Sequence, residues 1–332
     1  MSIPLQPAGP GASSDPVAIE QAALRLGVWA SLVIAVAGVV AYALSASDAL
    51  LLDGLYAGVM ALTSLVAARI GAVVQRPAER SWPLGYGGQE ALFVLFRSLL
   101  LIGMLSVAVM AAVREIVAWL GGGPPPAAVQ LGPVGIYTAL SVALCLLLAW
   151  RQQVAWQASG RHSELLLLES RAAALDGAIT AGAGAALLSA PLLAGTRLEP
   201  LVPLTDPVLV ILIALVVMVE PLQHFVEALR QTAGAACDPA LIASSRAQVL
   251  GLLAEAGGDT PVALLEFSLQ KLGRTTFLMA WLDPARPVDA AWMDGLRRRI
   301  ELCCGEALGP LRCELLLTRQ SPFGLSELPN QS

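Results

Sequence analysis

Charged residues are scarce in this chain. Asp, Glu, Lys and Arg make up 14% of its 332 residues, whereas hydrophobic residues make up 56%. A soluble domain carries about a quarter charged residues, so this composition excludes an ordinary soluble protein and indicates a membrane protein. The net charge of −5 and the lack of a large basic cluster exclude nucleic acid as an expected partner. The sequence also lacks a GxxxxGK[ST] phosphate loop and a nucleophile constellation, so we do not expect an enzyme.

Histidine and cysteine, which dominate tetrahedral zinc sites, are also few. The chain has 2 histidines and 5 cysteines. In chain order they are Cys145, His162, His224, Cys237, Cys303, Cys304 and Cys313. The cysteines after residue 230 show no evident disulfide framework, which is typical of a reducing compartment.

Long apolar stretches are what the chain has in abundance. A bilayer core takes roughly 20 helical residues, and six stretches meet that length: 26–44, 49–74, 91–120, 133–150, 165–194 and 206–225. Arginines gather in every second connection, while the other connections contain a single basic residue, Arg197. By the positive-inside rule, we expect the arginine-rich connections and both termini to face the cytoplasm. We therefore expect an integral protein in the lipid bilayer of the bacterial inner (plasma) membrane.

After Cys237 the pattern changes to that of a soluble domain. Asp238-Pro239 is typical of a helix start, and the helix is expected to run to about Glu255. Segments 262–273 and 274–284 read as strands with a turn near Gly273, 288–308 as an amphipathic helix, and 312–318 as a last strand. The order α-β-β-α-β is typical of an open-faced sandwich.

The predicted fold is thus a polytopic α-helical membrane protein with six transmembrane helices and a C-terminal cytoplasmic α+β domain. We expect a disordered tail over 1–19, which is rich in Pro, Gly and Ser. The transmembrane domain is expected over 20–232, the soluble domain over 237–320 and a C-terminal tail over 321–332.

Two aspartates interrupt the apolar stretches. Asp53 lies in LLLDGLYAGVMAL and Asp176 in AAALDGAITAGAGAAL. A carboxylate at membrane depth costs about 3 kcal/mol or more, so it normally faces a polar cavity, a partner or an ion. Two such groups in one bundle favour the binding of a cation, a proton or both, and transport is the first hypothesis.

Each aspartate also has a plainer interpretation. Asp53 is alternatively a solvated residue that caps a helix near the membrane surface, with Asp48 shortly before it. Asp176 is alternatively a structural carboxylate paired with Arg97 or Arg171.

Several local motifs, in order and spacing, resemble the cation diffusion facilitator family over roughly residues 20–320. Asp53-Gly-Leu-Tyr resembles the metal motif of the family's second helix, and Asp176 falls on the fifth-helix motif. WPLGYGGQEA, which starts at Trp82, resembles the Pro-Phe-Gly-Tyr/His-Gly-x-x-Glu-x loop before the third helix. Asp206-Pro207 resembles the Asp-Pro that opens the sixth helix. The resemblance implies six transmembrane helices, a cytoplasmic α-β-β-α-β domain that forms a homodimer, and outward exchange of a divalent metal for protons.

The resemblance also implies two metal ligands that this chain does not have. In the family, one ligand lies four residues after the first aspartate and another lies four residues before the second. Here those positions are Ala57 and Ala172, so the expected metal ligands are Asp53 and Asp176 alone. We name three secondary ligands by helical spacing, each with ordinary packing as its alternative: Tyr56, Thr180 and Met60.

Two carboxylates with water, hydroxyls or carbonyls suit hard ions such as Mn²⁺, Mg²⁺ or Fe²⁺ better than a tetrahedral zinc site. We expect no tightly bound cofactor. The transported divalent cation remains open among Mn, Fe, Zn, Co and Mg.

The soluble domain contains a second set of metal-binding side chains. Cys303, Cys304 and Cys313 form either a thiolate site for Zn²⁺ or Cu⁺ or a set of buried and half-buried thiols. Because neighbouring residues on a helix point about 100° apart, Cys303 and Cys304 are not expected to serve one site together.

We expect Asp53 and Asp176 to line a cavity that opens alternately to either side of the membrane. Burial favours a protonated carboxyl and a bound cation favours the carboxylate, so the same groups exchange a metal for protons. The rival function is a transport-inactive membrane scaffold or partner subunit, which the alanines at positions 57 and 172 favour. A third candidate is a proton-coupled carrier for a solute other than a metal.

Overall fold

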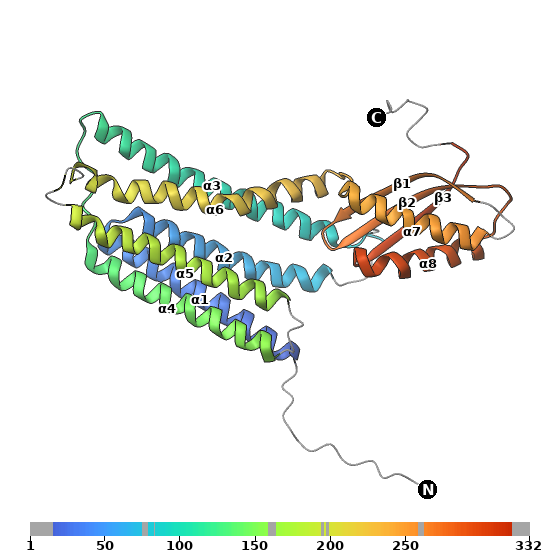
Figure 1. Ribbon diagram of the computed structural model, residues 1–332, viewed down its shortest axis with the longest axis horizontal. Helices are drawn as coiled ribbons and strands as arrows, with labels where there is room; N and C mark the ends of the chain where they lie inside the picture. Colours follow the sequence, from blue (N-terminus) through green and yellow to red (C-terminus); the bar gives the residue numbers. More distant parts are fainter. Residues whose placement is uncertain are drawn as a thin grey trace, which may run out of the picture. The chain divides into compact units, whose positions relative to one another are not determined.

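The computed structural model describes residues 16–74, 79–82, 84–158, 164–193, 196, 199–257 and 262–320. The chain forms two compact units (Figure 1). The first is built from Met1–Val66 and Leu101–Val219, and the second from Ala67–Leu100 and Glu220–Ser332. His162 and the predicted C-terminal tail lie outside the described residues.

The six predicted spans are all present as long helices. They are α1 (Pro16–Ser45), α2 (Asp48–Val74), α3 (Gly87–Leu120), α4 (Leu131–Ala158), α5 (Glu164–Ser189) and α6 (Thr205–Thr232). Each contains a segment long and apolar enough to cross a membrane, which confirms the predicted polytopic fold. Residues 1–15 of the predicted tail lie outside the described residues, and α1 begins at Pro16.

The observed helices are mostly longer than the predicted spans. For example, α6 continues to Thr232, past the predicted end at residue 225. An apolar window marks only the part of a helix that lies in hydrocarbon, because the polar ends continue as helix without the apolar pattern. The α5–α6 connection also contains two short 3₁₀ helices, η1 (Ala190–Leu193) and η2 (Glu199–Leu204), which the sequence did not predict.

Asp206 fixes the start of α2. Its buried carboxylate accepts hydrogen bonds from the Ser47 hydroxyl, the Asp48 N–H at 2.8 Å and the Ala49 N–H at 3.4 Å. The first N–H groups of a helix have no partner within the helix, and at membrane depth they must find one in the protein. A side chain of α6 therefore sets where α2 begins, and with it the depth of the residues that follow.

Within the first unit, α4 packs against both α5 and α1 (Figure 1). Glycines of α5 allow the close approach to α4. A Cβ atom at Gly177 would lie 2.9 Å from Cys145 Cβ, and one at Gly184 would overlap the Thr138 side chain. Small residues at a helix interface let the two backbones approach closely, and here they bring the polar side chains of α4 up to α5.

The second unit contains the predicted soluble fold. Its elements are α7 (Pro239–Gly257), β1 (Val262–Leu272), β2 (Thr275–Pro284), α8 (Ala290–Leu308) and β3 (Leu311–Leu317). The sheet order is β1-β2-β3, with β1 and β2 antiparallel and β2 and β3 parallel. Alternate residues of β2 are buried, among them Leu278, Ala280 and Leu282, and they pack with α7 and α8 in one core. This arrangement confirms the predicted α-β-β-α-β order.

The β1–β2 turn contacts the first turn of α3 and the end of α6, all within the second unit. Arg274 Nε lies 2.9 Å from Glu90 Oε1, and the Gly273 N–H donates to Gln231 Oε1 at 3.2 Å. Gly273 has a left-handed φ of 59°, and a Cβ atom there would overlap the Gly87 carbonyl oxygen. Both the backbone conformation and the available space therefore require glycine.

We predict that Gly273→Ala destabilises the second unit by at least about 1 kcal/mol, because alanine is strained at this φ and collides with Gly87. The matched control is Gly251→Ala on α7, where a Cβ atom meets open space. The melting temperature of the full chain in detergent, followed by tryptophan fluorescence, should fall for the first variant alone. Equal melting temperatures for the two variants would contradict this account of the turn.

Candidate functional site

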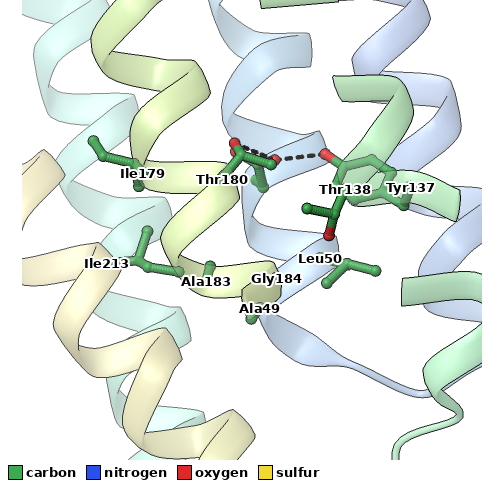
Figure 2. Close-up of a pocket in the computed structure, with 10 residues that line it drawn as sticks. Ala49, Leu50, Tyr137, Thr138, Ile179, Thr180, Ala183, Gly184 and Ile213 are labelled. Carbon is green, nitrogen blue, oxygen red and sulfur yellow. Dashed lines mark hydrogen bonds between the residues drawn. The ribbon is translucent and has the colours of Figure 1, made fainter. Parts of the chain in front are cut away.

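Asp53 lies inside α2 and is bound by side chains of two other helices. It follows the first residue of α2 by five positions, about 8 Å along the axis. The Tyr137 hydroxyl of α4 donates to Asp53 Oδ2 at 2.6 Å, and the Thr180 hydroxyl of α5 donates to the same oxygen at 3.3 Å (Figure 2). The helix start belongs to Asp48, whose N–H is capped by Asp206. These contacts favour the site over the capping alternative for Asp53.

A cavity adjoins this carboxylate. Figure 2 shows the residues that line it, which come from α2, α4, α5 and α6. They are Ala49, Leu50, Asp53, Tyr137, Thr138, Ile179, Thr180, Ala183, Gly184 and Ile213. Of the residues beyond Asp53 and Thr180 on their two helices, Ala49 and Leu50 precede Asp53 on α2, and Ala183 and Gly184 follow Thr180 on α5. The cavity therefore extends from Asp53 toward the end of the unit that carries the α1–α2 and α5–α6 connections. Four of its residues have polar side chains, and all four contribute oxygen atoms.

Asp176 is placed differently from the prediction. Its side chain is exposed on the surface of the single chain, and it is not among the residues that line the cavity. Because Thr180 is level with Asp53, Asp176 lies one helical turn away along α5, about 6 Å farther from the cavity end. The sequence correctly places both carboxylates within apolar helices. Of the two, Asp53 alone lines the cavity described here.

The fourth helix supplies polar groups that the sequence analysis missed. Tyr137, Ser141 and Cys145 follow one another at intervals of four, so they share one face of α4. All three side chains are buried. The Ser141 hydroxyl lies near Tyr137 without a hydrogen bond of normal geometry, and Cys145 lies within electrostatic reach of both Asp53 and Asp176. The sequence signal that could have identified these groups is the recurrence of polar residues every four positions in an otherwise apolar helix.

Of the three proposed secondary ligands, the structure brings one to the cavity. Thr180 lines the cavity and binds Asp53, whereas Tyr56 and Met60 are half-buried and do not line it. Ala57, at the family's second ligand position, packs against an apolar cluster. His224 is exposed on α6. Among the described residues, no group of three or more His, Cys, Asp or Glu side chains is close enough to hold a metal ion.

The thiols of the soluble domain lie in a packed core. Cys304 and Cys313 are buried in the cluster formed by α7, α8 and the sheet, whereas Cys303 is exposed. Burial, with the nearby Glu301 carboxylate, raises the pKa of the Cys313 thiol to about 12. Burial also raises the pKa of Cys304. Since the thiolate is the metal ligand, these environments favour the structural alternative for the two buried cysteines.

We predict that maleimide labelling of the folded chain at neutral pH modifies Cys303 first and leaves Cys304 and Cys313 unmodified until denaturant is added. The raised pKa keeps the two buried thiols protonated, and burial blocks access. Mass spectrometry of labelled peptides measures the three rates separately. Cys303→Ser should remove the early modification from this segment. Labelling of Cys313 as fast as Cys303 would contradict the observed burial.

Comparison with known proteins agrees with the fold. The family model for the cation efflux transmembrane domain matches residues 24–231, which include most of α1 and α6, all of α2 to α5 and the residues that line the cavity around Asp53. No curated protein matches the chain significantly. Members of the matched family are transporters of metal cations. Because the match covers well over half of the sequence, the chain belongs to the cation efflux, or cation diffusion facilitator, family.

Proposed function

We propose that this protein exports a divalent metal cation from the cytoplasm in exchange for protons, and that the Asp53 carboxylate binds the two in turn. The observation that carries the proposal is the pair of hydroxyls, from Tyr137 and Thr180, that hold this carboxylate between three helices. A carboxylate at membrane depth is costly. The surrounding helices provide it with donors that a bound cation or proton would have to displace.

The donor set favours a hard or borderline ion. The atoms around Asp53 are a carboxylate and hydroxyl oxygens, which suit Mn²⁺, Mg²⁺ or Fe²⁺. When a cation binds, the hydroxyls of Tyr137 and Thr180 can turn their oxygen lone pairs toward it in place of donating to the carboxylate. Few charged ligands also mean weak binding, which suits an ion that must be released on the other side. This argument supports Mn²⁺ as the first cation to test.

Asp176 serves as the inner binding group in this proposal. It lies about one helical turn from the level of Asp53, and the Cys145 thiol lies near both carboxylates. A cation that enters from the cytoplasm meets Asp176 first and then Asp53, if both termini face the cytoplasm as proposed. Release to the opposite side follows when protons return to Asp53. We further propose that the protein works as a homodimer through its soluble domain, in a bacterial inner membrane.

A second candidate, a transport-inactive scaffold, is favoured by one observation. No group of three or more His, Cys, Asp or Glu side chains among the described residues is arranged to bind a metal. Transport requires only transient coordination, which water can complete. We therefore place cation exchange first and let the flux experiment separate the two.

We predict that proteoliposomes carrying the protein take up Mn²⁺ against a pH gradient and that Asp53→Asn reduces uptake to the level of protein-free liposomes. Asparagine keeps the shape of the side chain and removes its charge and its titratable proton. Asp176→Asn should retain transport with an apparent affinity about 10-fold lower, a cost of about 1.4 kcal/mol. Parallel assays with Fe²⁺, Zn²⁺, Co²⁺ and Mg²⁺ identify the preferred ion.

The matched control is Asp294→Asn, which removes an exposed carboxylate from α8. It should transport as the unmodified protein does. A folded protein that carries none of these cations would refute the exchange function and favour the scaffold. Equal transport by Asp53→Asn would show that another group binds the ion.

A further inference from the structure

One polar atom of the cavity has no role in the contacts described so far. Thr138 Oγ1 is buried and has no hydrogen-bond partner among the described residues. Buried hydroxyls are nearly always hydrogen-bonded, to protein or to water, because an unpaired one has lost its bonds to solvent without replacement. Thr138 lines the same cavity as Asp53, and Figure 2 shows it between Tyr137 and Leu50. The position of this hydroxyl therefore indicates a partner inside the cavity.

The local packing creates the space for this hydroxyl. Thr138 of α4 faces Gly184 of α5, and a Cβ atom at Gly184 would overlap Thr138 Oγ1. Two residues earlier, Gly182 faces open space. Glycine at position 184 thus allows a threonine hydroxyl to occupy a buried position next to the cavity.

The cavity beside Thr138 has room for about one water molecule. Such a water would find Thr138 Oγ1 and the Asp53 carboxylate as partners, because the hydrogen bonds from Tyr137 and Thr180 both use Oδ2 and leave Oδ1 outside them. The remaining lining is mostly apolar. It offers too few ligands to replace the hydration shell of a divalent cation, but a proton needs only a chain of hydrogen bonds.

We propose that Thr138 holds a water molecule that relays protons between Asp53 and the end of the bundle where α2 begins. In this relay the water donates a proton to the Asp53 carboxylate and receives one from a solvent water that reaches the far end of the cavity, so charge and protons balance. Thr138 keeps its own proton and orients the water, which makes it a positioning residue. The inference rests on the proposed exchange function and separates the proton route from the route of the cation.

The titratable groups around this route come from five helices. Those near Asp53 are Tyr137, Cys145 and Asp176. At the far end the cavity reaches Ala49, whose N–H is bonded to Asp206. Asp48 and Glu115 lie within electrostatic reach of Asp206. These three carboxylates attract cations and protons alike, so the experiment must measure the two routes separately.

The decisive variant is Thr138→Val, which keeps the volume of the side chain and removes only the hydroxyl. In proteoliposomes, proton-driven Mn²⁺ uptake should fall about 10-fold or more at saturating Mn²⁺, with an unchanged KM. Exchange of radioactive Mn²⁺ for unlabelled Mn²⁺ at equal pH on both sides needs no proton and should stay within about twofold of the unmodified protein. Thr138→Ser should restore proton-driven uptake.

Two controls separate the relay from a general effect on structure. Thr63→Val removes a hydroxyl that donates to the backbone carbonyls of Val59 and Met60 in its own helix, and it should change neither flux. Gly184→Ala should reduce proton-driven uptake as Thr138→Val does, since the added Cβ displaces Thr138. Gly182→Ala should have no effect.

The outcomes distinguish this inference from the function on which it rests. If Thr138→Val leaves both fluxes unchanged, or lowers both equally, the relay is refuted while exchange through Asp53 stands. If the unmodified protein shows neither flux, the exchange function itself is refuted and the relay with it.

Discussion

The hydrogen bonds that Asp53 accepts from Tyr137 and Thr180 are the interaction on which this transmembrane unit depends. A polar group in a bilayer must find its partners inside the protein, and Asp53 finds them on two neighbouring helices. The same bonds therefore hold α2, α4 and α5 in register and keep a carboxylate at membrane depth. The proposed cation site and the contacts that associate these helices are one arrangement of atoms.

The rest of the unit positions that carboxylate. Asp206 caps α2 from α6 and so sets the depth of Asp53. The glycines of α5 bring α4 close enough for Tyr137 to reach across. Because each of these contacts joins residues far apart in the sequence, the site exists only after the helices have packed. A change in helix packing would alter the Asp53 environment, which is what an alternating-access transporter requires.

Much of the fold could be predicted from local patterns. Apolar length gave six helices, and the alternation of buried residues such as Leu278 and Leu282 identified the strands of the soluble domain. The cost of a charge in hydrocarbon singled out Asp53 and Asp176. The sequence could not show that these two aspartates differ in depth and exposure, since that depends on the register between helices. The hydrogen bond between Asp53 and Tyr137 joins residues 84 positions apart, so no local pattern predicts it. A tyrosine in an apolar helix is equally consistent with ordinary packing.

The central claim is that one carboxylate, Asp53, binds a proton and a cation in turn. The most direct test measures proton release when Mn²⁺ binds to the purified protein in weakly buffered detergent solution. We predict release of about one proton per bound ion, retained by Asp294→Asn and lost in Asp53→Asn. Binding of Mn²⁺ without proton release, or equal release by Asp53→Asn, would contradict the account.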